Sequence, residues 1–158
     1  MAGYSVIIIE KPVVAQTTAT AGFPERYDTA LQLKIIDELR QQPFFTYVID
    51  GTKKGADGLG ITLPADARRL VLSSTIIGFD RGSRNTRIAI GLGFGSAKVK
   101  VKFVFRDADN DLDELIILTQ EGRFGNFTEV FDPDKNVTVT GASSEVVDGL
   151  VRVIKKNR

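Results

Sequence analysis

Hydrophobic and polar positions alternate along this chain with two different periods, and their order predicts the elements of the fold. Branched apolar residues dominate residues 4–14, which indicates a buried strand. Residues 25–42 carry apolar side chains four positions apart, as is typical of an amphipathic helix, and residues 144–157 repeat this pattern. Between these helices the pattern predicts strands over residues 44–50, 68–80, 88–106 and 112–124.

These elements follow one another in the order β-α-β-β-β-β-α. Consecutive strands joined by turns, with two helices available to cover one face, predict an α+β fold. We expect a mostly antiparallel sheet of about five strands with both helices packed on one face. The chain has 158 residues, so we expect a single domain over residues 1–158.

The predicted strand that contains IAIGLGFGSAKVKVKFVF (88–105) has two unlike faces. Its first face carries small residues followed by large apolar ones: Ala89, Gly91, Gly93, Gly95, Ala97, Val99, Val101, Phe103 and Phe105. Its second face carries an apolar row followed by polar residues: Ile88, Ile90, Leu92 and Phe94, then Ser96, Lys98, Lys100 and Lys102. The lysines are expected to face solvent, whereas the apolar row needs a cover, either the 51–67 loop or a partner. A bulge at a glycine would switch this assignment.

The three glycines of this strand raise the alternative of a phosphate-binding loop. Gly91 and Gly93 fit the first two positions of the G-x-G-x-x-G fingerprint, but Ser96 occupies the third. A strand pattern follows, so no helix N-terminus awaits a phosphate. We therefore interpret Gly91, Gly93 and Gly95 as structural glycines that allow another backbone to approach closely, and we expect no nucleotide or other cofactor.

Composition narrows the chemistry further. The chain has no His and no Cys, which removes the commonest general base, thiolate nucleophiles and Cys-based zinc sites. The net charge of +1 gives no overall attraction to nucleic acid or anionic lipid. No apolar run approaches the roughly 20 residues of a membrane-spanning helix. We expect a protein that is not an enzyme, binds no nucleic acid and has no transmembrane segment.

Arginines cluster in the turn over residues 81–87. Arg81, Arg84 and Arg87 can bind an anion or a partner's carboxylate, and the glycine-rich loop over residues 51–67 can complete such a site. The alternative is a set of ordinary salt bridges around a turn.

Phe103 and Phe105 face away from the neighbouring lysines, which is unlike the surface of an RNA-binding sheet.

A run of acidic residues follows the long strand. Asp107, Asp109 and Asp111 match the first, third and fifth positions of a calcium-binding loop. Leu112 occupies the position of the required glycine, and Leu118 that of the final glutamate. We therefore expect a polar hairpin turn and no metal site.

The segment GSRNTRIAIGLGFGSAKVKVKFVFRDAD resembles bacterial domain-of-unknown-function family 4410, in which a Gly-Ser-Arg-x-x-Arg turn leads to a Gly-x-Gly-x-Gly segment and a long strand ending in Asp. The resemblance covers residues 69–124 and implies a secreted or lipid-anchored envelope protein of unassigned activity. Asn110 and Asp111 stand where Thr-Gly is more typical, and no lipobox Cys is present. The order of elements is also similar to the periplasmic domains of the curli secretion lipoprotein and of penicillin-binding-protein activator lipoproteins, which act by protein contact.

Together these observations predict a bacterial envelope domain that acts as a protein-interaction or assembly module. Its expected surface is the row of Ile88, Ile90, Leu92 and Phe94, which would contact another protein or a second copy. The alternative is a small-ligand or anion-binding protein that uses the 81–87 turn and the 51–67 loop. We expect a periplasmic location or the periplasmic face of the outer membrane, attached only through a lipid anchor outside this sequence; the cytoplasm is the alternative.

Overall fold

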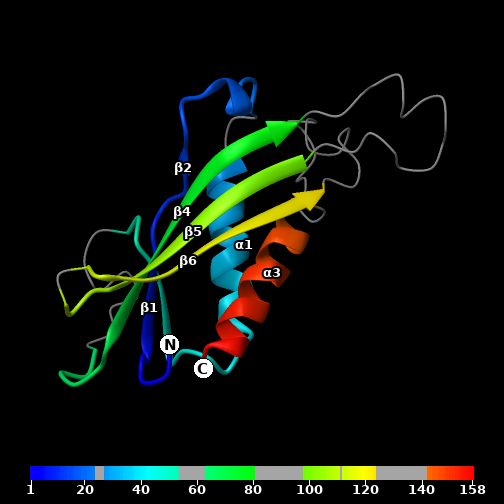
Figure 1. The fold of residues 1–158 in the computed structure, drawn as a ribbon. Helices are drawn as coiled ribbons and strands as arrows, with labels where there is room; N and C mark the ends of the chain where they lie inside the picture. The colour runs from blue at the N-terminus through cyan, green and yellow to red at the C-terminus, as the bar shows by residue number, and fades with distance from the viewer. Residues whose placement is uncertain (24–26, 54–62, 81–97, 111, 124–141) are drawn as a thin grey trace.

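The computed structural model describes residues 1–23, 27–53, 63–80, 98–110, 112–123 and 142–158. Within them, two α-helices lie on one face of a six-stranded sheet (Figure 1). The elements are β1 (Val6–Ile9), β2 (Val13–Val14), the 3-10 helix η1 (Thr18–Thr20), α1 (Tyr27–Arg40), β3 (Tyr47–Asp50), β4 (Arg69–Asp80), β5 (Lys98–Asp107), β6 (Glu114–Arg123) and α3 (Ala142–Lys156). The predicted α+β class and the predicted order of elements are confirmed.

The sheet is mixed, with the strand order β3-β1-β4-β5-β6 and β2 beside β4. β1 lies between β3 and β4 and is parallel to both. β4, β5 and β6 are long antiparallel strands joined in sequence order. Most paired residues therefore belong to antiparallel ladders, as predicted, while the parallel pairing of β1 was not predicted.

The prediction of one continuous strand over residues 4–14 is wrong. The structure has two short strands there, and Pro12 lies between them. Proline lacks the N–H that a sheet ladder needs, so pairing stops before it. The chain resumes pairing at Val13 and Val14, which lie beside Thr75 and Ile76 of β4.

The predicted strand over residues 44–50 is shorter in the structure, because β3 begins at Tyr47. Phe44 and Phe45 precede it and are buried in the core. Their side chains stabilise the fold by packing into the hydrophobic core, without contributing to the ladder. The two predicted helices differ from α1 and α3 by only two residues at each end or fewer.

The core lies between the helices and the inner face of the sheet, the face toward α1 and α3. Alternate residues of β5 supply its centre, and both helices contribute an apolar stripe. Burying each such side chain is worth about 1.5–3 kcal/mol. The principal contributors are Leu31, Ile35 and Leu39 of α1, Val99, Val101, Phe103 and Phe105 of β5, and Val146, Val147, Leu150 and Ile154 of α3.

The predicted alternation of the long strand is confirmed over residues 98–103, beyond which Val104 on the outer face is buried as well. Val99, Val101, Phe103 and Phe105 are buried, while Lys100 is exposed and the neighbouring lysines are partly exposed. An irregularity in the pairing lies in β4, between Ile76 and Gly78, so it leaves this alternation intact. No helix in the described ranges is long and apolar enough to cross a membrane.

Candidate functional site

The site residues predicted from the sequence fall within residues 81–97, which lie outside the described residues. They are the apolar row Ile88, Ile90, Leu92 and Phe94, the arginines Arg81, Arg84 and Arg87, and the glycines Gly91, Gly93 and Gly95. Most of the 51–67 loop lies outside them as well. These assignments stay predictions, so candidate sites are sought in the rest of the chain.

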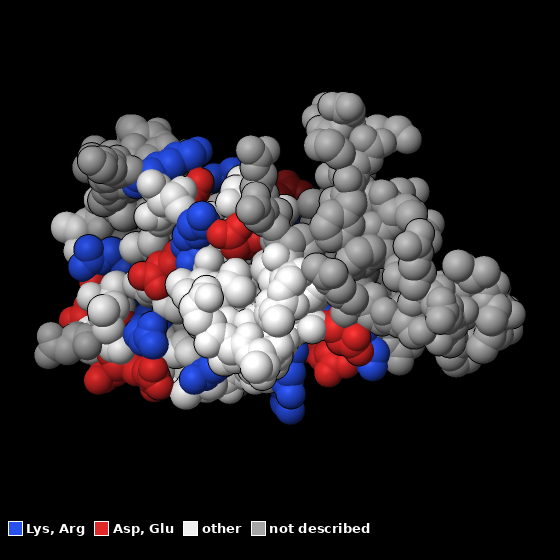
Figure 2. All heavy atoms as spheres, turned by 90° about the horizontal axis from the view of Figure 1, so that it is seen from above, with Lys and Arg blue, Asp and Glu red and all other residues white. Residues whose placement is uncertain are grey.

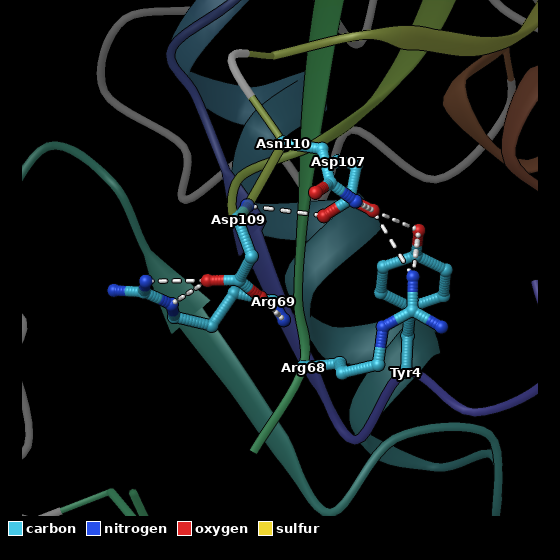
Figure 3. Close-up of polar contacts among 6 residues, drawn as sticks. All are labelled: Tyr4, Arg68, Arg69, Asp107, Asp109 and Asn110. Atoms are coloured by element: carbon cyan, nitrogen blue, oxygen red, sulfur yellow. Dashed lines mark hydrogen bonds and ion pairs between the residues drawn. The ribbon is translucent and has the colours of Figure 1, made fainter. Parts of the chain in front are cut away.

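The most extensive polar cluster surrounds Asp107 at the end of β5 (Figure 3). The Tyr4 hydroxyl donates a hydrogen bond to Asp107 Oδ2 over 2.7 Å. Arg68 Nη2 donates to the same oxygen over 3.0 Å, and Asn110 Nδ2 donates to it over 2.7 Å. The backbone N–H of Asp109 donates to Asp107 Oδ1 over 3.0 Å. Both carboxylate oxygens are therefore engaged by groups of the protein itself.

These contacts keep Asp107 charged although its side chain is only 3% exposed. The hydrogen bond from the Tyr4 hydroxyl, helped by those from Asp109 N–H, Asn110 and Arg68, lowers the pKa of Asp107 to about 2, against the opposing effect of burial. Burial and the contact with Asp107 raise the pKa of Tyr4. The Arg68 guanidinium also lies 4.3 Å from the centre of the Tyr4 ring. Both oxygens of the buried Asp107 carboxylate thus have hydrogen-bond donors, and the cluster anchors the end of β5 to Tyr4 and Arg68.

A second ion pair continues this anchor along the sheet end. Asp109 Oδ2 accepts from the backbone N–H of Arg69 over 2.8 Å, and Asp109 Oδ1 accepts from Arg69 Nε over 2.7 Å. These bonds, the backbone one first, lower the pKa of Asp109. The turn after β5 is thereby fixed to the beginning of β4.

The two described aspartates of the calcium-like run do not converge. Asp107 faces Tyr4 and Arg68, whereas Asp109 faces Arg69 (Figure 3). Asp111 lies outside the described residues. Among the residues that the structure does describe, no three His, Cys, Asp or Glu side chains are grouped so that they could hold a metal ion. The described carboxylates of this turn therefore hold strands together.

A cavity of about 510 Å³ opens at the other end of the sheet, between the β2–α1 connection and the beginning of α1. Lys11 Nζ lies 3.0 Å from Asp28 Oδ2 at its edge, with the lysine side chain 55% exposed and the aspartate 21%. Burial alone would raise the pKa of Asp28, but the hydrogen bond and charge of Lys11 outweigh it and lower the pKa.

The other described residues that line this cavity are uncharged. Its lining includes Gln16, Thr17 and Thr29, with Phe23 as the aromatic member. The Phe23 ring meets the Tyr27 ring edge-on, with their centroids 5.2 Å apart. Figure 2 shows this end of the molecule from above, with an area free of charged side chains bordered by both blue and red atoms. A lining that combines one ion pair, uncharged polar side chains and an aromatic ring suits a small polar ligand better than an extended polyanion.

The outer face of the sheet, opposite α1 and α3, carries the most exposed apolar side chains of the long strands. Ile117 is 53% exposed and Leu115 is 43% exposed, both on β6. Ile116 and Leu118 alternate with them and pack against the core. The sequence contains a signal for this exposure, because four successive apolar residues at 115–118 cannot all be buried in a strand with one covered face.

Comparison with known proteins supports the fold. A search of family models finds no match, and a search of curated proteins finds none either. The chain is similar to the hypothetical protein CT253 from Chlamydia trachomatis, at 12% identity over 96% of each chain and with a TM-score of 0.58. This similarity concerns the fold alone, because the identity is so low. The resemblance to family 4410 stays a prediction.

A second solved structure is more distant. A suspected homologue of the neuraminyllactose-binding hemagglutinin from Helicobacter pylori matches 99% of this chain and 84% of its own, at 11% identity. Its TM-score of 0.36 is too low to support any inference about fold or ligand.

Proposed function

We propose that this domain is a non-enzymatic binding module that contacts another protein through the β5–β6 part of its outer sheet face. The observation that carries the proposal is the exposure of Ile117 and Leu115 on a sheet face that α1 and α3 leave open. Large apolar side chains grouped on a surface are typical of sites that bind a partner. The inner face of the same strands is already used for the core.

The polar clusters support a role in binding over one in catalysis. Asp107 is buried, and four donors of the protein itself already engage its two carboxylate oxygens. Lys11 and Asp28 neutralise each other at the edge of an open cavity. The Tyr4 hydroxyl does lie against the Asp107 carboxylate, but the low pKa of Asp107 makes it a weak base and the raised pKa of Tyr4 makes its hydroxyl hard to activate.

The resemblance to family 4410 supports a bacterial envelope location for this module. Fractionation of cells that carry the complete coding sequence tests this location. Recovery of the protein in the cytoplasmic fraction alone would contradict it.

Site-specific photo-crosslinking tests the binding surface. A photoreactive phenylalanine analogue is placed at Ile117 or, as the matched control, at Leu33 of α1, which is 57% exposed. Since the two positions are equally accessible, random collisions should label both alike. We expect a discrete adduct with another protein from Ile117 and none from Leu33. Equal labelling from both positions, or an adduct only with a second copy of the chain, would contradict the proposal.

A second candidate function is the binding of a small polar ligand, which the cavity beside Lys11 and Asp28 favours. A paired ammonium and carboxylate, with amide and hydroxyl groups nearby, can orient such a ligand. A thermal-shift screen with amino acids, sugars and phosphates tests this function. A genuine ligand should raise the melting temperature of the wild type but not that of Lys11→Ala. No stabilisation by any compound would remove this candidate.

A further inference from the structure

Lysines occupy every second position along the outer face of β5. They are Lys98, Lys100 and Lys102, and each alternates with a core residue. Alternate residues of a strand are roughly 6.5–7 Å apart, so the ammonium groups form a regular row. β5 lies between β4 and β6, so this row runs along the middle of the antiparallel half of the sheet.

The neighbours of this row do not neutralise it. Lys98 Nζ lies 3.6 Å from Glu121 Oε1, which uses the nearest carboxylate of β6. Lys100 lies between Gly78 and that same Glu121 in the pairing register. Within the described ranges, no carboxylate lies within 4.0 Å of the ammonium group of Lys100 or Lys102. Two positive charges on this face are therefore available to a partner.

Hydroxyl and apolar side chains border these free charges. Lys102 is paired with Thr75 of β4 and Thr119 of β6. Val13 lies beside Thr75, and Ile117 precedes Thr119 by two positions on the same face. The surface thus combines cations with apolar contacts, and it is complementary to an extended chain that presents acidic and apolar side chains on the same face.

We propose that the partner contacts this face through an extended acidic segment. Carboxylates two residues apart in an extended segment have the same spacing as Lys100 and Lys102, so both can be paired at once. The side chain two positions beyond the second carboxylate lies on the same face of the segment, and an apolar residue there would contact Ile117. This inference rests on the proposed function and adds the chemistry of the partner to it.

Other polyanions fit this face less well. Single-stranded nucleic acids bind sheets through aromatic side chains that stack on the bases, but Phe103 and Phe105 are buried on the inner face. Anionic membranes attract clusters of about four to eight basic residues, more than this row supplies. An acidic protein segment needs only the two free cations and the apolar border.

A binding experiment with a defined probe tests the inference. The probe is a fluorescein-labelled peptide with Glu at two alternate positions and Val at the next alternate position, separated by Thr, and its control carries Gln in place of Glu. The tested variant is Lys100→Gln with Lys102→Gln. The matched variant is Lys155→Gln with Lys156→Gln, which removes the same charge from the exposed end of α3. Circular dichroism confirms that both variants are folded.

We expect the wild type to bind the acidic peptide and not the Gln peptide. The β5 variant should bind it about tenfold more weakly, and the α3 variant within about twofold of the wild type, since only the former removes contacting charges. Equal weakening in both variants, or no binding by the wild type, would overturn the inference. Tighter binding of polyuridylate or phosphatidylglycerol vesicles through the same lysines would also overturn it.

The two proposals can fail separately. An adduct from Ile117 whose yield is unchanged by the β5 substitutions would leave the proposed function intact and refute the acidic segment. Loss of peptide binding in the β5 variant, without any partner adduct from Ile117, would leave the lysine row as a binding surface and refute the proposed function.

Discussion

The two faces of the antiparallel half of the sheet are built from alternate residues of the same strands, yet they differ in nearly every physical respect. The inner face of β5 carries four buried apolar residues that hold the helices. Its outer face carries three lysines, and two of them have no ion-pair partner among the residues that the structure describes. The difference shows that one strand can meet the demands of folding with half of its side chains and leave the other half available for binding.

The largest effect should come from the inner face. Phe103 is fully buried between β4 and β6 and beneath the helices, so Phe103→Ala removes a large side chain and leaves a cavity. We expect a loss of about 3–5 kcal/mol in the free energy of unfolding. Urea denaturation measures it. The outer-face neighbour Lys102→Ala is the control, and a comparable loss there would mean that the two faces are not distinct.

The polar end of the inner face should give stability a characteristic dependence on pH. Asp107 has a pKa of about 2 in the folded chain against an ordinary 3.8, so the unfolded chain binds its proton more readily. The contribution of the Asp107 charge to the free energy of unfolding is therefore complete above about pH 4, and it is lost as the pH falls from about 4 to about 2. Asp107→Asn should lower the melting temperature at neutral pH, and the difference from wild type should shrink across that window.

Melting curves at several pH values measure this effect. Asp66→Asn, at an exposed carboxylate with no described ion pair, is the control. A difference between Asp107→Asn and wild type that stays constant down to about pH 2 would show that hydrogen-bond geometry alone, without the charge, accounts for the role of Asp107.

A smaller effect of opposite sign is expected from the serines of β4. Ser74 lies on the inner face, and its hydroxyl is buried without a hydrogen-bond partner. Ser73 lies on the outer face and accepts a hydrogen bond from Arg106 Nη1 over 2.9 Å. Ser74→Ala should therefore raise the free energy of unfolding by about 1 kcal/mol, because an unsatisfied buried hydroxyl is removed.

Ser73→Ala should lower the same free energy slightly, since it breaks an existing contact. Urea denaturation of both variants measures these two changes in the free energy of unfolding. A loss of stability in Ser74→Ala would show that its hydroxyl has a partner after all, for example an internal water.

The smallest effect on stability should come from the proposed binding surface. Ile117→Thr keeps a branched side chain on an exposed strand position and should change the free energy of unfolding by less than about 0.5 kcal/mol. Leu33→Thr on α1 provides the helical comparison. A large destabilisation by Ile117→Thr would assign Ile117 to the fold and would weaken its assignment to a binding surface.

Much of the fold could be predicted from the sequence because periodicity records which face of an element is covered. The amphipathic stripe of residues 25–42 and the alternation of residues 98–105 each have one buried side, and both were predicted. The parallel placement of β1 could not be predicted in this way, since a fully buried strand shows no alternation that indicates its neighbours. Pro12 was a visible signal for the break between β1 and β2, and it was overlooked.

The candidate sites were harder to predict, for two different reasons. The contact between Tyr4 and Asp107 joins residues 103 positions apart, and no local pattern connects them. The exposure of Ile117 was within reach, because the apolar run at 115–118 contradicts a strand with one covered face. The glycines of residues 88–97, which form the more conspicuous pattern in the sequence, lie outside the described residues.

The position of β1 has a consequence for how the chain acquires its structure during synthesis. β1 is made first, yet its two neighbours are β3 at residues 47–50 and β4 at residues 69–72. β3 can pair with one edge of β1 soon after α1 has been made. The other edge of β1 has no partner until β4 has been made, about sixty residues after β1 ends. Four successive branched apolar residues are therefore exposed to other nascent chains during that interval, so we expect this segment to be the main site for chaperone contact or aggregation.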